Sequence, residues 1–220
     1  NNLRKINSFL QNINNKNNNR NFTIKNPAGE HAICAGLKEE MSVLIKGHVG
    51  YYCGGMNQKA SITVDGNAGT GLGENMMSGT IHVKGNTSQS AGATAHGGTI
   101  IIEGDASSRC GISMKGVEII VKGSVGHMSA FMAQAGTLLI CGDAGEALGD
   151  SIYETIIYIA GTPKSLGVDC VEKKITNKDL KKIENLIKIA NIKKLKPHNF
   201  KKFGSARKLY NFNIDNVSEY

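Results

Sequence analysis

The chain has 220 residues and a mass of 23.5 kDa, which suits one domain with an appendage. Its 27 glycines beside only three prolines exclude a collagen-like repeat, and so much glycine disfavours long helices. No apolar run approaches the roughly 18 residues of a membrane span, and we expect neither a membrane anchor nor a signal peptide. We therefore expect a cytoplasmic protein made of many short strands joined by tight turns.

The net charge of +8 is confined to the C-terminal part of the chain. Residues 1–170 hold 13 Lys+Arg and 13 Asp+Glu, whereas residues 171–210 hold 13 basic and three acidic residues. Such a segment can bind an acidic partner or nucleic acid, and it can also be a solvated face. Because aromatic residues are not interleaved with the lysines, the sequence favours the solvated face, and we expect neither nucleic acid nor a membrane as partner.

Residues 1–22 are rich in asparagine, with ten Asn among the first 21 positions. A polar, low-complexity start of this kind rarely has enough apolar surface to fold. We expect residues 1–22 to be a disordered or extended lead-in.

A repeat of 19 residues runs through residues 23–170. The leading position is glycine in seven successive repeats, at Gly47, Gly66, Gly85, Gly104, Gly123, Gly142 and Gly161. A column three residues later reads Gly50, Gly69, Ser88, Ser107, Gly126 and Gly145, and a column seven residues later reads Gly54, Gly73, Gly92, Gly111, Ala130 and Gly149. Aliphatic residues stand two and four positions before each leading glycine, as Ile45 and Val43 do before Gly47.

Residues two apart in a strand face the same side, so each repeat contains a short strand with one apolar face. One unit cannot bury that face alone, whereas stacked units can. We predict an all-β fold, a single-stranded, right-handed parallel β-helix of about 19 residues per coil over residues 23–170. Propeller blades repeat at about 40 residues, sandwiches lack so regular a period, and left-handed hexapeptide helices prefer a period divisible by six.

The five cysteines do not indicate a redox or metal site. Cys34, Cys53 and Cys110 share a repeat column with Leu72 and Ala91, which indicates small core residues. Cys34 and Cys53 could reach disulfide distance in adjacent coils, but an odd cysteine count favours a reducing compartment. No C-x-x-C occurs, and the histidines do not gather at ligand spacing; they are His31, His48, His82, His96, His127 and His198.

Three further patterns could in principle carry chemistry. The segment Gly66–Gly73 resembles a phosphate-binding glycine loop, but its glycines recur in other coils and so indicate turns. Arg109 and Lys115 are the only cations near Cys110, which is weak support for an activated thiol. The densest acidic group has no second acidic coil beside it; it comprises Asp143, Glu146, Asp150 and Glu154, with Tyr153 among them. We predict no catalytic, cofactor-binding or metal-binding residue in this chain.

Residues 171–220 are predicted to form a basic C-terminal helix and an arm. Thr176 with Asp179 is typical of a helix start, and one face of the helix is apolar at Leu180, Ile183, Leu186, Ile187 and Ala190. We expect this helix to cover the open end of the stack. The following segment, with Phe200, Phe203, Leu209, Tyr210 and Phe212, is either a partner-binding arm or an arm folded against its own rod.

The spacing G-x-x-G-x-x-x-G is intact in three coils, those that begin at Gly47, Gly66 and Gly142. It resembles the motif of the glutamate synthase C-terminal (GXGXG) β-helix domain, which also occurs in a formylmethanofuran dehydrogenase subunit. The chain departs from the pattern at Ser88, Ser107 and Ala130, where a positive φ would cost more than at glycine.

A closer resemblance is carried by four segments: Arg109–Gly116, Gly123–Gly136, Cys141–Glu154 and Phe203–Tyr210. They are similar to the stand-alone β-helix subunits of methylamine–glutamate N-methyltransferases (N-methylglutamate synthases), over roughly residues 25–215. This resemblance implies a non-catalytic structural subunit. Its partners would be a glutaminase-like, class II amidotransferase subunit and a glutamate-synthase-like subunit that carries FMN and an iron–sulfur cluster.

The resemblance also implies a reaction and a role. The complex would make N-methyl-L-glutamate and ammonia from methylamine and L-glutamate, while this chain, without a cofactor of its own, would hold the partner sites at a fixed distance. An alternative is a β-helix scaffold subunit of another glutamate synthase or formylmethanofuran-dehydrogenase-like oxidoreductase. An independent carbohydrate-active β-helix enzyme is disfavoured, because neither an export signal nor stacked carboxylates are present.

The residue before each leading glycine alternates in charge from Lys46 through Asp65 and Lys84 to Glu103 and Lys122. If coils stack in register, opposite charges are neighbours, and we expect Asp65→Lys to lower the denaturation midpoint in low salt. The loss should be much smaller in high salt, since exposed pairs contribute only a few tenths of a kcal/mol and are screened. A loss that is the same at both salt concentrations would contradict the ladder.

Overall fold

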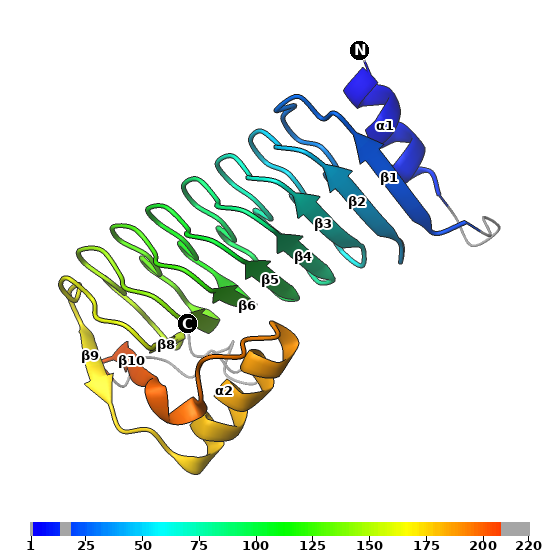
Figure 1. Cartoon of the computed structure of the whole chain (residues 1–220). Helices are drawn as coiled ribbons and strands as arrows, with labels where there is room; N and C mark the ends of the chain where they lie inside the picture. The colour runs from blue at the N-terminus through cyan, green and yellow to red at the C-terminus, as the bar shows by residue number, and fades with distance from the viewer. Residues whose placement is uncertain (1, 14–18, 208–220) are drawn as a thin grey trace, which may run out of the picture.

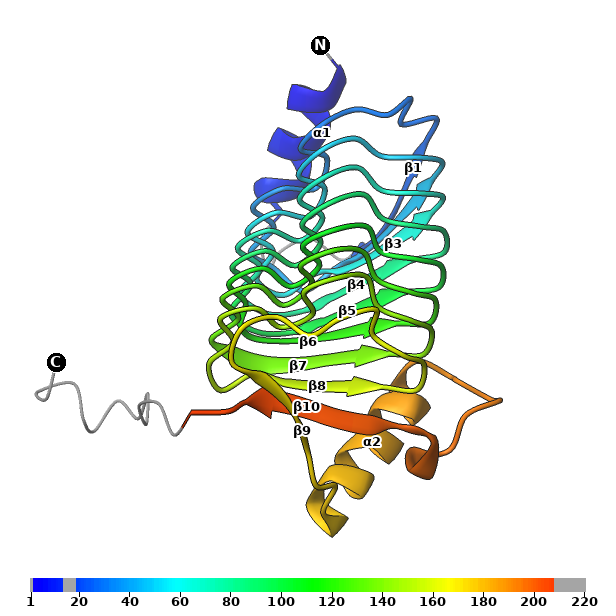
Figure 2. The same cartoon turned by 90° about the vertical axis from the view of Figure 1, so that its left-hand side faces the viewer.

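The computed structural model describes residues 2–13 and 19–207, and most of these residues form a solenoid of stacked coils (Figure 1). Eight strands run parallel, each beside the next, and form one wall of the solenoid (Figure 2). They are β1 (Asn21–Lys25), β2 (Ser42–Lys46), β3 (Ser61–Asp65), β4 (Thr80–Val83), β5 (Thr99–Ile102), β6 (Lys115–Val121), β7 (Ala135–Ile140) and β8 (Ile156–Ile159). The predicted parallel β-helix is confirmed, while its right-handed winding stays a prediction.

The strands pair in the register that the repeat predicts. Val64 is the partner of Val83, and Val83 is the partner of Ile102, so equivalent residues lie above one another. A second row of single bridges joins the coils at positions that follow shortly after the strands, from Val49↔Ala68 to Ala144↔Pro163. The aliphatic columns of the strands point inward and are buried, so they form one continuous core along the solenoid.

Glycine is needed in the turns for two different reasons. A Cβ on Gly69 would lie 2.7 Å from the backbone carbon of Gly50 in the preceding coil, so this column marks a close approach of two backbones. Gly73 has φ of +62°, in the left-handed region that glycine adopts without strain. At the equivalent position Ala130 has φ of +57°, so the cost expected for this departure is present there.

Residues 2–11 form a helix, α1 (Asn2–Gln11), so the disordered or extended lead-in predicted for residues 1–22 is wrong there. Leu10 and Ile13 are 2% and 4% exposed and pack against the core. The asparagines suggested a disordered segment. In the structure, asparagine side chains of α1 instead form hydrogen bonds with backbone groups of the first coil. Asn7 donates to the carbonyl of Ala32 at 2.7 Å and accepts from the amide of Cys34 at 2.9 Å.

The C-terminal segment closes the sheet with two further strands, β9 (Cys170–Lys173) and β10 (Lys201–Ser205). The sheet order ends β8-β10-β9, with β10 antiparallel to both neighbours. Along the chain, α2 (Asn177–Ile189) and a short 3₁₀ helix, η1 (Pro197–Asn199), lie between β9 and β10. Phe200 and Phe203 are each 3% exposed, so the arm folds against its own rod up to residue 207, and Leu209, Tyr210 and Phe212 lie outside the described residues.

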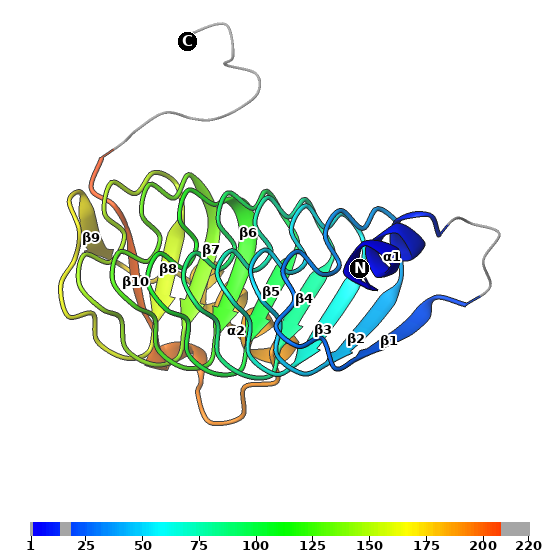
Figure 3. The ribbon, with the colours of Figure 1, turned by 90° about the horizontal axis from the view of Figure 1, so that it is seen from above.

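Helix α2 begins where predicted, after Thr176, but the expectation that it covers the end of the stack is wrong. Its buried residues pack against the outward-facing residues in the middle of strands β5 to β8, and Figure 3 shows α2 level with these later coils. The reason lies in one column, which includes the polar Thr63 and His82 beside Leu44 in the early coils and is continuously hydrophobic further on: Ile101, Ile120, Leu139 and Tyr158. The late outer face is apolar, and α2 buries it.

The close approach at Gly69 predicts a large effect for a single methyl group. We expect Gly69→Ala to destabilise the solenoid by about 1–3 kcal/mol, because the backbone of the adjacent coil cannot retreat without breaking its hydrogen bonds. Ser107→Ala, at the same column in a coil that already holds a Cβ, is the matched control and should change stability by less than about 0.5 kcal/mol. Chemical denaturation followed by circular dichroism measures both, and equal midpoints would contradict the close-approach role.

Candidate functional site

The buried cysteines are core residues in the structure. Cys34, Cys53 and Cys110 are 0% exposed, and all five cysteines are free thiols. Burial raises the pKa of the thiols of Cys34 and Cys110 to about 12. Because the thiolate is the nucleophile and the metal ligand, neither thiol is activated, and Arg109 and Lys115 do not lower the pKa of Cys110.

The glycine-rich segment Gly66–Gly73 has its backbone donors occupied. The amide of Gly69 donates to the carbonyl of Val49, that of Gly71 to Gln89, and that of Gly73 to Cys53, all at 2.9–3.0 Å. A phosphate-binding loop needs these N–H groups free to point at the ligand. The stacking of coils therefore removes the feature that would make this segment a phosphate site.

The acidic group around residues 143–154 is divided among separate contacts. Asp143 accepts from the amide of Thr162 at 2.8 Å, and Glu146 pairs with Lys164 at 2.7 Å. Asp150 accepts from the hydroxyl of Ser151 and the amide of Val168. Each of these carboxylates thus bonds to its own partner in a neighbouring turn, so its oxygens serve the fold.

Two histidines accept hydrogen bonds from turn amides, and a third contacts a carboxylate. The amide of Tyr51 donates to His31 Nδ1 and that of Asn67 donates to His48 Nδ1, both at 2.9 Å, while His82 contacts Glu103 at 2.7 Å. Within residues 2–13 and 19–207, no group of three or more His, Cys, Asp or Glu is arranged to hold a metal ion.

Sequence reasoning missed a polar ladder along one edge of the solenoid. The residue after each of the first six leading glycines accepts a hydrogen bond from the backbone amide of its equivalent one coil further on, at 2.7–3.0 Å. The ladder runs through His48, Asn67, Asn86, Asp105, Ser124, Asp143 and Thr162. The signal that could have found the ladder is a side chain with a hydrogen-bond acceptor at this position of every repeat.

Sequence reasoning also missed the attachment of α2, which depends on Asp179. The carboxylate of Asp179 accepts from the Tyr158 hydroxyl at 2.6 Å, from the Thr176 amide at 2.8 Å, and from Lys202 Nζ, which lies 2.8 Å from Oδ1. Burial alone would raise the pKa of Asp179, but the hydrogen bonds from Lys202, Thr176 and Tyr158 outweigh it and hold the pKa well below its usual range. One carboxylate thus joins the cap of α2 to both β8 and β10.

These contacts define a parallel β-solenoid whose turns and core are occupied by structural interactions, with an attached C-terminal module, residues 170–207. The chain belongs to the family of the GXGXG motif, whose model matches residues 2–214. It is also 52% identical over 218 residues to Protein GlxC of Rhizobium meliloti (strain 1021), a match that covers 99% of this chain and 96% of that protein. Membership of the GXGXG family confirms the resemblance that the glycine spacing carried. No helix of the described segments is long and apolar enough to cross a membrane.

The role of Asp179 predicts a local, pH-dependent loss of stability. At pH 7 we expect Asp179→Asn to lower the free energy for opening α2 and β10 by about 2–3 kcal/mol, because Lys202 loses its buried counter-charge. The folded-state pKa is depressed, so this stabilisation is present above the unfolded pKa of about 4 and is lost as pH falls through the folded pKa. The difference in this opening free energy between wild type and variant should therefore become smaller below about pH 4.

Amide hydrogen exchange of α2 and β10 measures this gap. Glu146→Gln, which breaks the exposed pair with Lys164 on a turn of the solenoid, is the control and should leave the opening of α2 unchanged. A gap that stays constant from neutral pH to pH 3 would show that the Asp179 charge is not what holds the module.

Proposed function

We propose that this chain is the non-catalytic β-helix subunit of a methylamine–glutamate N-methyltransferase. In that complex a glutaminase-like subunit and an FMN- and iron–sulfur-bearing glutamate-synthase-like subunit accompany it. The complex makes N-methyl-L-glutamate and ammonia from methylamine and L-glutamate. The five free thiols fit a reducing compartment, and we place the complex in the cytoplasm.

The observation that carries the proposal is the extent of the similarity to Protein GlxC. The aligned region covers 99% of this chain and 96% of that protein, so the similarity extends over both the solenoid and the C-terminal module. The motif segments Arg109–Gly116, Gly123–Gly136 and Cys141–Glu154, which carry the resemblance to these subunits, follow one another along successive coils.

The packing of the chain supports a structural role. The inward columns are filled by aliphatic and small side chains from Val43 to Ile159, and the turn amides bond to neighbouring coils. A continuous core with occupied turn donors suits structural contact with other subunits better than the binding of a substrate in the coil interior.

The mechanism that follows is the fixing of distance and orientation. From β1 to β8 there are seven strand spacings, or about 34 Å at about 4.8 Å each. Each coil is bonded on both sides, so the rod cannot bend or shorten without opening ladder hydrogen bonds. Two partner subunits bound to such a rod keep a constant separation, so a small amine can pass from one site to the other without escaping to water.

The test is reconstitution with the two partner subunits. We expect the tagged chain to co-purify with flavin absorbance, and the complex to form N-methylglutamate from methylamine and L-glutamate, while the chain alone forms none. Omitting the chain should lower the rate even when both other subunits are present. N-methylglutamate made by the chain alone would overturn the structural role, and a complex that uses ammonia but not methylamine would favour a subunit of another glutamate synthase.

A further inference from the structure

The strongest feature that the fold leaves unexplained is the positive charge of the C-terminal module. Residues 171–207 hold 12 Lys+Arg and only three Asp+Glu, whereas residues 1–170 are neutral. Three of these cations have ion-pair partners: Lys182 pairs with Glu118, Lys202 with Asp179, and Arg207 with Asp169. These pairs attach the module to itself and to the solenoid.

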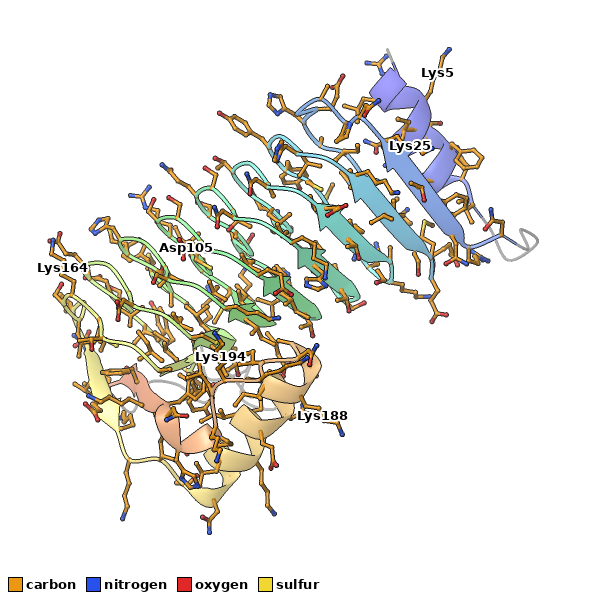
Figure 4. The ribbon with its side chains drawn as sticks, viewed as in Figure 1. Lys5, Lys25, Asp105, Lys164, Lys188 and Lys194 are labelled. Carbon is orange, nitrogen blue, oxygen red and sulfur yellow. The ribbon has the colours of Figure 1, made fainter. Side chains whose placement is uncertain are left out.

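The remaining nine lysines are exposed and form what we call the lysine surface. Among the described residues no ion pair engages them; they are Lys173, Lys174, Lys178, Lys181, Lys188, Lys193, Lys194, Lys196 and Lys201. Figure 4 shows Lys188 on α2 and Lys194 on the segment after it, at the other end of the molecule from Lys5 and Lys25. So many like charges on one module repel one another, and an acidic partner would relieve that repulsion.

An apolar groove lies within the lysine surface. It has a volume of about 450 Å³ and is lined by Ile192, Leu195 and Cys141, with Lys193 and Lys194 also in its lining. Ile192, Leu195 and Cys141 are partly buried and pack against the cluster that holds α2 on the sheet. An apolar recess surrounded by charged residues has the anatomy of a protein–protein interface, with a core for an anchor side chain and a polar rim.

We propose that the lysine surface and its groove bind an acidic surface of a partner subunit, one of whose apolar side chains enters the groove. The proposal rests on the proposed function, since it assigns to this surface one of the subunits that the chain would hold. A protein fits better than nucleic acid, because both aromatic residues of the module, Phe200 and Phe203, are buried and leave no ring for base stacking. The only arginine of the module, Arg207, is paired with Asp169.

Two matched charge variants test the proposal in the reconstituted complex. The test variant carries Lys181→Glu, Lys193→Glu and Lys194→Glu, and the control carries Lys25→Glu, Lys38→Glu and Lys59→Glu, exposed lysines of the solenoid. Both variants lower the net charge of the chain by the same amount, because each replaces three lysines by glutamate. We expect the test variant to raise the Kd for a partner subunit at least tenfold and to flatten its salt dependence, and the control to change the Kd less than twofold.

Cys141 provides a second measurement that does not depend on charge. It is the only partly exposed cysteine of the described residues, so a maleimide should modify it before the four buried thiols. Burial raises the pKa of the Cys141 thiol to about 11, with Lys122 opposing, so labelling will be slow and is followed over hours. We expect assembly to slow the labelling of Cys141 at least fivefold in the wild type, and Cys141→Ser to remove the signal.

The outcomes separate the two proposals. If the wild-type chain does not assemble with the flavin-bearing and glutaminase-like subunits, the proposed function fails and this interface fails with it. If wild type, test variant and control assemble with equal affinity, or if Cys141 stays reactive in the complex, only the interface is overturned. Binding of duplex DNA or RNA by the wild type at about 150 mM salt, lost in the test variant alone, would also overturn it in favour of a nucleic-acid surface.

Discussion

The constraint on which the rest of the structure depends is the in-register hydrogen bonding of one coil to the next. Successive coils are joined by hydrogen bonds in three places: along the strands, along a second row of bridges, and along the polar ladder. Because adjacent backbones lie so close, some positions cannot hold a Cβ without displacing the neighbouring chain, as at Gly69. The regular glycine columns are therefore a consequence of stacking as much as of turn conformation.

The same bonding limits what chemistry the solenoid can perform. Amides that might bind an anion are used between coils, the acidic side chains hold turns, and the thiols of the core stay protonated because they are buried. A molecule built in this way is suited to presenting surfaces at a fixed spacing. The proposed structural role then depends on surfaces outside the coils, and the C-terminal module is the largest such addition in the part of the chain that the structure describes.

That module is held by contacts that reach far along the chain. One outward-facing column of the sheet is hydrophobic in every coil from Ile101 to Tyr158, and α2 covers it. Asp179 bonds to Tyr158 and Lys202 from different strands. The paired cations are used in attachment, so the unpaired lysines gather on the outside. A firm attachment matters for an interface, since a charged helix that moved freely would lose binding energy when a partner ordered it.

The sequence by itself determined the repeat, the parallel strands, the aliphatic core and the start of α2 at Thr176, because each depends on residues at fixed local spacing. It also indicated that Cys34, Cys53 and Cys110 belong to the core. Only the tertiary structure decided where the two helices lie. The apolar spacing of Leu3, Ile6, Leu10 and Ile13 was concealed by asparagine, and no local pattern states that Asp179 meets Tyr158 and Lys202. Those contacts join residues 21 to 23 positions apart through space, where the free energy depends on which surfaces the stacked coils leave uncovered.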